Sequence, residues 1–244
     1  MVATSLCGWD ARASWWQRAP SSGFKWRPWL LRVVPVTLGA GTILLFMTAD
    51  VIYVRMVFPE VDANLYNPAA MIGLGLTMYA LPLAQVMFPK VARSVALTGR
   101  SRVMPLALGV TAVGVAAGAI ACTFCPSLPL RVIYYSKPVY WAAAPLVPWY
   151  AWTIVPLALA NVLINNLLAH GRFRIVPCVV AVAGFFLGLL FLLRTWLPMQ
   201  PPLLAFKVLL GIMAGCNVLL LVIGILFTRA TYAPRTAAGF GTHA

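Results

Sequence analysis

Six long apolar segments dominate this chain of 244 residues and constrain its fold more than any other feature. Each is rich in Leu, Ile, Val, Ala, Phe and Gly, and at about 1.5 Å per residue each is long enough to cross a hydrocarbon core ~30 Å thick. Their hydrophobicity is continuous rather than alternating, which favours helices over the strands of a membrane barrel. The segments cover residues 33–54, 66–88, 104–123, 140–169, 175–193 and 203–228.

The composition points the same way. Hydrophobic residues make up 62% of the chain and charged residues 9%, whereas a soluble domain carries about 25% charged residues. These values exclude an ordinary soluble enzyme and predict an all-α membrane protein with six transmembrane helices. The net charge of +14 would suit nucleic acid if the cations formed one patch. Here they fall between the apolar segments, so we expect the lipid bilayer, and no nucleic acid, as a partner.

The cations also predict the orientation of the chain. Most of them lie in alternate connections: before the first segment, between the second and third, between the fourth and fifth, and after the sixth. Fewer lie on the opposite side, namely Arg55, Arg131, Lys137, Arg194 and Lys207. Because cytoplasmic loops carry an excess of Lys and Arg, both termini are expected in the cytoplasm.

Two polar segments flank the predicted membrane region at 33–228. Residues 1–32 are basic and rich in tryptophan, a combination that favours a cytoplasmic or interfacial segment at the level of the lipid headgroups. A disordered tail is the alternative for this segment. Residues 229–244 are expected to form a short cytoplasmic tail.

Catalytic and metal-binding patterns are scarce. The chain has no H-E-x-x-H, G-x-S-x-G or phosphate-loop motif and no pair of carboxylates within the apolar segments. We therefore expect no enzymatic activity, no cofactor and no metal. Cys122 and Cys125 form a C-x-x-C pair at the outward end of the third segment. A disulfide is one possibility there, but two inert thiols are favoured.

Asp50 is the most informative residue, because it is the one acidic residue inside an apolar segment. A carboxylate in a membrane is costly, and it usually faces the interior of the bundle or a water-filled path and marks an ion or substrate site. Arg55 follows five residues later, about 140° around an ideal helix, so the two are not expected to pair directly. We assign Asp50 and Arg55 as candidate substrate- or ion-binding residues; a structural role for Asp50 is the alternative.

The fourth segment is longer than a bilayer demands and is interrupted by Pro145, Pro148 and Pro156. Broken helices of this kind often line the cavities of transporters, where neighbouring helices or water satisfy the freed carbonyls.

A polar stripe follows near the cytoplasmic end of that segment. Asn161 and Asn165 lie one turn apart, and Arg172 is expected on the same face, about 20° from Asn161. This stripe could meet a phosphate-bearing head group, and all three are candidate binding residues. Alternatively, the asparagines bond to neighbouring helices and Arg172 anchors at lipid phosphates.

Three segments resemble the second half of Wzx-type polysaccharide flippases, members of the multidrug/oligosaccharidyl-lipid/polysaccharide exporter superfamily. In that family an apolar span with an aspartate is followed by V-x-V-R, for which this chain has I-Y-V-R at 52–55. A short acidic loop that ends in N-L-Y comes after it. A span end with F-P-x-x-A-R comes next. A long helix follows, and where the family pattern is N-x-x-L-x-A-x-G-R this chain has the similar N-x-L-x-A-x-G-R at 165–172. In order, these are TADVIYVRMVFPEVDANLYNPAAMI (48–72), VMFPKVAR (86–93) and AAAPLVPWYAWTIVPLALANVLINNLLAHGRFR (142–174).

The resemblance implies one six-helix lobe of a flippase that moves lipid-linked oligosaccharide across a bacterial inner membrane, often coupled to an ion gradient. Asp50, Arg55 and Arg172 are the matching positions. Such flippases have twelve to fourteen spans in two lobes, so this chain would need a separately encoded first lobe or a homodimer. The alternatives are half of a drug/cation antiporter of the same superfamily, or a non-transporting remnant or scaffold.

Overall fold

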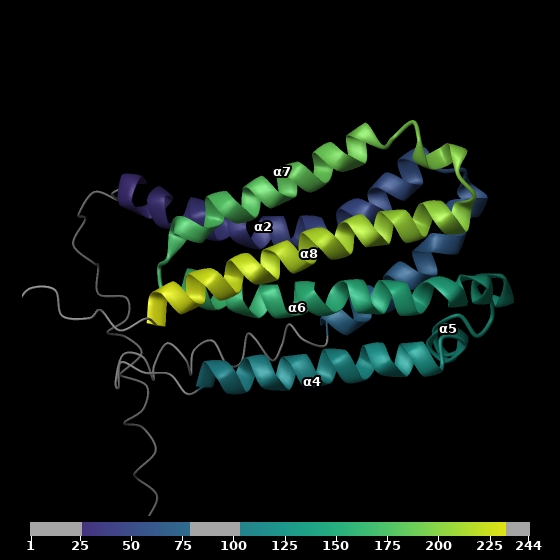
Figure 1. The fold of residues 1–244 in the computed structure, drawn as a ribbon, viewed down its shortest axis with the longest axis horizontal. Coiled ribbons are helices and arrows are strands. Elements are labelled where there is room, and N and C mark those ends of the chain that lie inside the picture. Colours follow the sequence, from purple (N-terminus) through teal and green to yellow (C-terminus); the bar gives the residue numbers. More distant parts are fainter. Residues whose placement is uncertain (1–25, 79–102, 233–244) are drawn as a thin grey trace, which may run out of the picture. The chain divides into compact units, whose positions relative to one another are not determined.

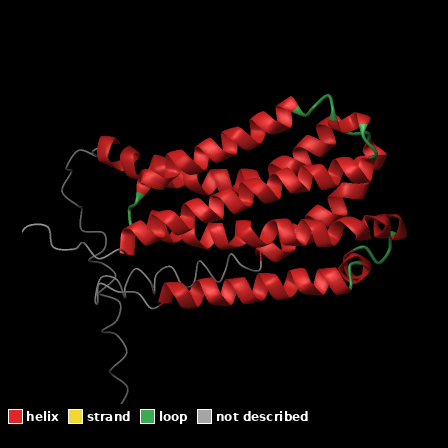
Figure 2. Ribbon diagram, in the orientation of Figure 1, coloured by secondary structure: helices red, strands yellow, loops and turns green. Residues whose placement is uncertain are grey.

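The computed structural model describes residues 26–78 and 103–232 (Figure 1). Within these ranges all regular structure is helical and no strand occurs (Figure 2), which confirms the prediction of an all-α chain. The chain divides into two units, Met1–Val34 and Pro35–Ala244. In the first unit, the described residues are the opening turns of one helix; the rest of that helix and all other described elements belong to the second unit.

The described part of the chain contains six α-helices and three 3-10 helices, and a further helical stretch covers residues 60–78. The sequence explains two of the starts, since Pro148 and Pro177 lie in the first helical positions, where the missing N–H is not needed. The elements are α2 (Trp26–Val57), α4 (Val103–Phe124), α5 (Ser127–Ile133), η2 (Pro138–Leu146), α6 (Val147–Ala169), η3 (Phe173–Ile175), α7 (Val176–Leu192), η4 (Leu197–Met199) and α8 (Pro202–Tyr232).

Four helical segments are long and apolar enough to cross a membrane: Val33–Val57, Pro138–Ala169, Phe173–Leu192 and Pro202–Ala230. A fifth span results if Leu108–Phe124 and Ser127–Ile133, which meet at 97°, count as one. The expected second span is helical as far as residue 78, and its remainder at 79–88 lies outside the described residues. The number six and the cytoplasmic termini therefore stay predictions, as do the assignments that rest on residues 1–25, 79–102 and 233–244.

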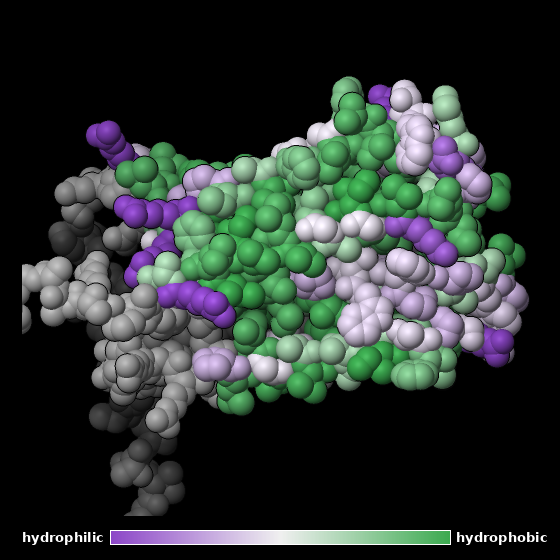
Figure 3. Space-filling model, viewed as in Figure 1, coloured by the Kyte–Doolittle hydropathy of each residue, from purple (hydrophilic) through white to green (hydrophobic). Residues whose placement is uncertain are grey.

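The outer surfaces of these helices are apolar, as lipid contact requires. Large side chains such as Phe185, Phe191 and Leu192 are more than half exposed, and Figure 3 shows apolar residues across the middle of the helices with polar residues nearer their ends. In water an exposed apolar surface of this extent would cause aggregation. A lipid environment removes that cost.

Helix α6 is the central element of the bundle. In Pro138–Ala169, 72% of an apolar stretch of 18 residues is buried, whereas the corresponding stretches of the other three spans are between 33% and 39% buried. It runs beside both α4 and α8 (Figure 1). A close approach to α8 is possible because Gly224 lacks a side chain: a Cβ there would lie 3.2 Å from the Cβ of Leu163.

The fourth segment is broken differently from the prediction. Residues Pro138–Leu146 form a 3-10 helix that contains Pro145, and α6 begins only at Val147, with Pro148 in its first turn. Pro156 is the proline inside α6. Pro148 therefore starts a helix rather than interrupting one, because its fixed φ suits the first turn.

Candidate functional site

The candidate site lies where α2, the helix at 60–78 and α6 meet, and its centre is Asp50. The Asp50 side chain is completely buried, although it lies on a helix whose composition is almost entirely apolar. Tyr66 and Tyr150 are also almost completely buried and reach Asp50 from the other two helices. We call these three residues the acid cluster.

Both tyrosine hydroxyls donate to the same carboxyl oxygen. The Tyr66 hydroxyl lies 2.7 Å and the Tyr150 hydroxyl 2.5 Å from Oδ2 of Asp50. These are short distances, typical of strong O–H···O hydrogen bonds to a carboxyl group. The second oxygen, Oδ1, is buried and has no hydrogen-bond partner among the described residues. The carboxyl group is therefore held on one side and left unsatisfied on the other.

Aromatic packing fixes the two tyrosines. Their rings meet edge to face with centroids 5.8 Å apart, and Tyr66 also packs on Phe206 of α8 at 5.1 Å. Gly73 makes room for Tyr150, because a Cβ at position 73 would collide with the Tyr150 ring. The helix at 60–78 can thus approach α6 closely enough for both hydroxyls to reach one oxygen.

This arrangement can hold a proton on the Asp50 carboxyl group. Burial of a carboxyl group costs several kcal/mol unless its oxygens are satisfied, and here one oxygen retains its lone pairs. Such a group is a functional-site candidate when it lies within a membrane. Because the cluster is closed in this conformation, Asp50 does not contact a large substrate.

Arg55 is not part of the cluster. It lies in the last turn of α2 and is exposed, whereas Asp50 is buried. The two residues therefore do not share a face, as their spacing of five predicts.

The predicted stripe of Asn161, Asn165 and Arg172 is only partly formed. Asn165 donates to Asn161, with Nδ2 and Oδ1 2.5 Å apart, so the asparagines bond to each other. At about 1.5 Å per residue, Asn161 lies ~16 Å further along α6 than Tyr150 and does not join the acid cluster.

The expectation that Arg172 shares a helical face with Asn161 is wrong, because α6 ends before it. Gly171 has a left-handed backbone, with φ of +67°. The N–H of Gly171 donates to the carbonyl of Leu168 and that of Arg172 to the carbonyl of Leu167, which together form a Schellman motif. Arg172 is thus exposed beyond the helix end. The sequence signal was present in Gly171, a residue typical of this position.

A second buried polar contact joins α6 to α8 beside Pro156. The Asn217 side chain donates to the backbone carbonyl of Thr153 at 2.9 Å, and Asn217 is fully buried. The proline removes a backbone donor from this part of α6, and a side chain of the neighbouring helix supplies a hydrogen bond close by. The N–H that Pro156 lacks would have donated to the carbonyl of Trp152. The Asn217 bond therefore ties α8 to the neighbouring carbonyl and does not replace the missing donor.

Sequence reasoning found Asp50 but missed its two partners. Tyr66 and Tyr150 are 16 and 100 residues away, so no local spacing connects them with the carboxyl group. Their only signal was a phenolic hydroxyl within an apolar helix, which needs a partner when buried.

Metal binding finds no support in the described residues, which contain no group of three or more His, Cys, Asp or Glu side chains suited to an ion. Cys122 and Cys125 are both free thiols, in line with the favoured interpretation.

Comparison of the chain with protein-family models, with curated proteins and with solved structures gives no significant match.

Proposed function

We propose that this protein is one lobe of a transporter that moves a lipid-linked oligosaccharide across a bacterial inner membrane, with Asp50 as its ion-coupling group. The observation that carries the proposal is the acid cluster, a buried carboxyl group within apolar helices. The proposal also rests on the flippase-like segments. Two of the three, 48–72 and 142–174, contain all three residues of the cluster.

The cluster suits a coupling role because three helices converge on one oxygen atom. If Asp50 gains or loses a proton, or binds a cation at Oδ1, the strength of both tyrosine hydrogen bonds changes. The contacts of α2 with the helix at 60–78 and with α6 change with them. An ion thereby favours one arrangement of the helices over another, which is the requirement for coupled transport.

A single lobe cannot provide alternating access, which requires one bundle to move against another. We therefore propose that the working unit is a homodimer or a complex with a separately encoded first lobe. Pairing of two identical copies about a two-fold axis is the commoner solution among soluble proteins.

The test is transport by Asp50→Asn, which keeps the shape of the side chain but removes its negative charge. The full chain is reconstituted into vesicles that contain a fluorescent polyprenyl-pyrophosphate oligosaccharide, and the label exposed on the outer leaflet is followed by chemical quenching. We expect Asp50→Asn to slow transport at least tenfold while membrane insertion is unchanged. Glu60→Gln is the matched control, because Glu60 is an exposed acid at the start of the next helix.

Three outcomes would overturn the proposal. Transport by Asp50→Asn at the wild-type rate would exclude Asp50 as a coupling group. Export of a cationic dye, without movement of the lipid-linked sugar, would instead identify a drug/cation antiporter lobe. If no cargo moves even when a first lobe is supplied, the chain is a non-transporting scaffold.

A further inference from the structure

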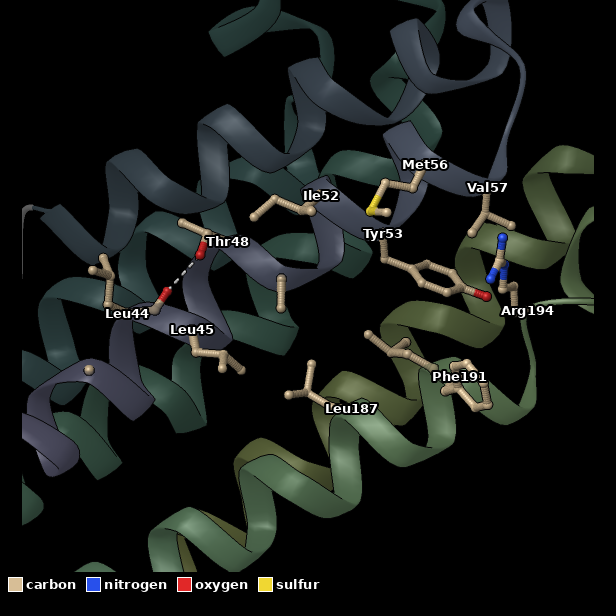
Figure 4. A pocket seen from close by; sticks show the side chains of 13 residues that line it. Leu44, Leu45, Thr48, Ile52, Tyr53, Met56, Val57, Leu187, Phe191 and Arg194 are labelled. Carbon is tan, nitrogen blue, oxygen red and sulfur yellow. Dashed lines mark hydrogen bonds between the residues drawn. The ribbon is translucent and has the colours of Figure 1, made fainter.

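A lateral groove separates α2 from α7, on the lipid-exposed side of these helices. The two helices touch where the rings of Phe46 and Phe186 stack, with centroids 5.0 Å apart. Beside this contact lies a cavity of about 590 Å³ that is lined by side chains of both helices (Figure 4). Its volume falls within the range of roughly 300–1,000 Å³ that is typical of small-molecule sites.

The walls of the groove are apolar and open to the bilayer. Leu44, Ile52 and Met56 of α2 line it, together with Leu187 and Phe191 of α7. All five side chains are between 42% and 78% exposed. A hydrocarbon chain can therefore enter from the side without first passing through water.

One end of the groove is polar. Arg194 follows α7 there and is exposed, and the Tyr53 side chain points toward it (Figure 4). The Tyr53 hydroxyl is buried and has no hydrogen-bond partner among the described residues. A buried hydroxyl without a partner costs about 1–3 kcal/mol, so an acceptor placed beside Arg194 would satisfy it.

We propose that this groove binds an anionic glycerophospholipid, with one acyl chain along the apolar walls and the phosphate group at Arg194 and Tyr53. A guanidinium group binds phosphate oxygens through two parallel hydrogen bonds, and the tyrosine hydroxyl donates a third. This inference is independent of the proposed transport function, because the groove contains no residue of the acid cluster.

The dimensions of the groove suit a lipid. From Gly41 to Val57 it extends along about 24 Å of helix α2 at 1.5 Å per residue, whereas one leaflet is about half of a ~30 Å hydrocarbon core. The groove is therefore long enough to hold the full acyl chain of a lipid whose phosphate lies at the polar end.

The charge distribution explains why we favour an anionic lipid over a second protein. The groove has one cation and the Tyr53 hydroxyl at one end. Its remaining walls are apolar except for Thr48, whose hydroxyl donates to the carbonyl of Leu44, and this distribution matches a single lipid. By contrast, Arg131 lies over the ring of Trp141 at 5.1 Å, so that cation already has a partner. Arg131 therefore serves as a control for a cation that lies outside the groove.

The test measures lipid binding by native mass spectrometry of the full chain in detergent, with phosphatidylglycerol and phosphatidylcholine as probes. We expect wild type to retain one phosphatidylglycerol in preference to phosphatidylcholine. Arg194→Gln should lower this preference at least tenfold, and Tyr53→Phe should lower it a few-fold. Arg131→Gln should leave it unchanged.

A second pair of variants tests the apolar part of the groove. Gly41 lines the groove, and Gly41→Leu should fill it and displace both lipids. Gly184→Leu is the matched control, since a Cβ at Gly184, as at Gly41, meets no atom within 4 Å among the described residues and Gly184 does not line the cavity. Circular dichroism reports whether each variant is folded.

Three results would overturn the proposal. Equal loss of binding in Arg131→Gln and Arg194→Gln would indicate only a general attraction between cations and anionic lipid. Unchanged lipid retention in both Arg194→Gln and Gly41→Leu would place the lipid elsewhere. Cross-links from a photoreactive residue at Leu187 to a second copy of the chain, rather than to lipid, would identify the groove as a protein interface.

Discussion

Removal of the two tyrosine hydroxyls tests how the acid cluster is held. Tyr66→Phe and Tyr150→Phe each delete one donor to Asp50 Oδ2 and leave the aromatic packing in place. Interhelical hydrogen bonds in a membrane protein average about 0.6 kcal/mol, with a maximum near 1.7 kcal/mol. Because both bonds are short and buried, we expect each single variant to lower the free energy of unfolding by about 1–1.5 kcal/mol.

The double variant should cost more than the sum of the two single ones. After one substitution Oδ2 still accepts a hydrogen bond, but after both the buried carboxyl group has lost its two hydroxyl donors. A buried polar group left without a partner costs about 1–3 kcal/mol. We therefore expect a coupling free energy of about 1–2 kcal/mol between Tyr66 and Tyr150, within the range of roughly 0.5–3 kcal/mol found for residues of one network.

A rescue variant shows whether the double phenylalanine variant is destabilised by its unsatisfied carboxyl group or by a loss of packing. Asp50→Leu, added to the double phenylalanine variant, replaces the unsatisfied carboxyl group with an apolar group of similar shape. This change should restore at least 1 kcal/mol, since replacing all partners of a buried polar contact is often nearly neutral. Unfolding is followed by far-ultraviolet circular dichroism in mixed micelles of increasing denaturing detergent. Additive costs with a total below about 0.5 kcal/mol, or further destabilisation by Asp50→Leu, would refute this account.

Two further predictions concern glycines. Gly73→Ala should lower the free energy of unfolding by about 1–3 kcal/mol, because its methyl group would displace the Tyr150 ring; Gly75→Ala, whose Cβ meets no described atom within 4 Å, should be neutral or slightly stabilising in the same assay. Gly171→Ala should cost about 1–2 kcal/mol because φ is +67°, whereas Gly188→Ala in α7 should not destabilise the protein in thermal unfolding.

The sequence predicted the helical class well, and the reason is physical. In a lipid environment, the backbone N–H groups of a continuous apolar segment can donate only to backbone carbonyls. Such a segment therefore forms a helix. The ends of four spans were predicted closely, because Val33–Val57, Pro138–Ala169, Phe173–Leu192 and Pro202–Ala230 each begin and end within three residues of the predicted segment. The start of the first helix was not predicted. α2 begins at Trp26, seven residues before the predicted span, because the basic and tryptophan-rich residues that precede position 33 are themselves compatible with a helix.

Of the three residues in the acid cluster, only Asp50 was predicted from the sequence. Asp50 was recognisable because one acidic residue in an apolar segment is costly wherever it lies. Its partners were not, because Tyr150 becomes a neighbour only when α6 packs against α2. Arg172 shows the opposite error: a helical spacing was extended past Gly171, whose left-handed backbone ends the helix.

Helix α2 connects the two sites that the structure reveals. Asp50 points into the bundle toward Tyr66 and Tyr150, while its neighbours Ala49 and Tyr53 line the groove against α7. A movement of α2 that separates Asp50 from the tyrosines therefore also alters the walls of the groove. If a lipid in the groove favours one position of α2, the binding of a proton or cation at Asp50 must in turn change the affinity for that lipid, because coupling between two sites is reciprocal. The acid cluster and the groove thus lie on two faces of α2. A ligand that binds at one of them is then expected to change the affinity of the other for its own ligand.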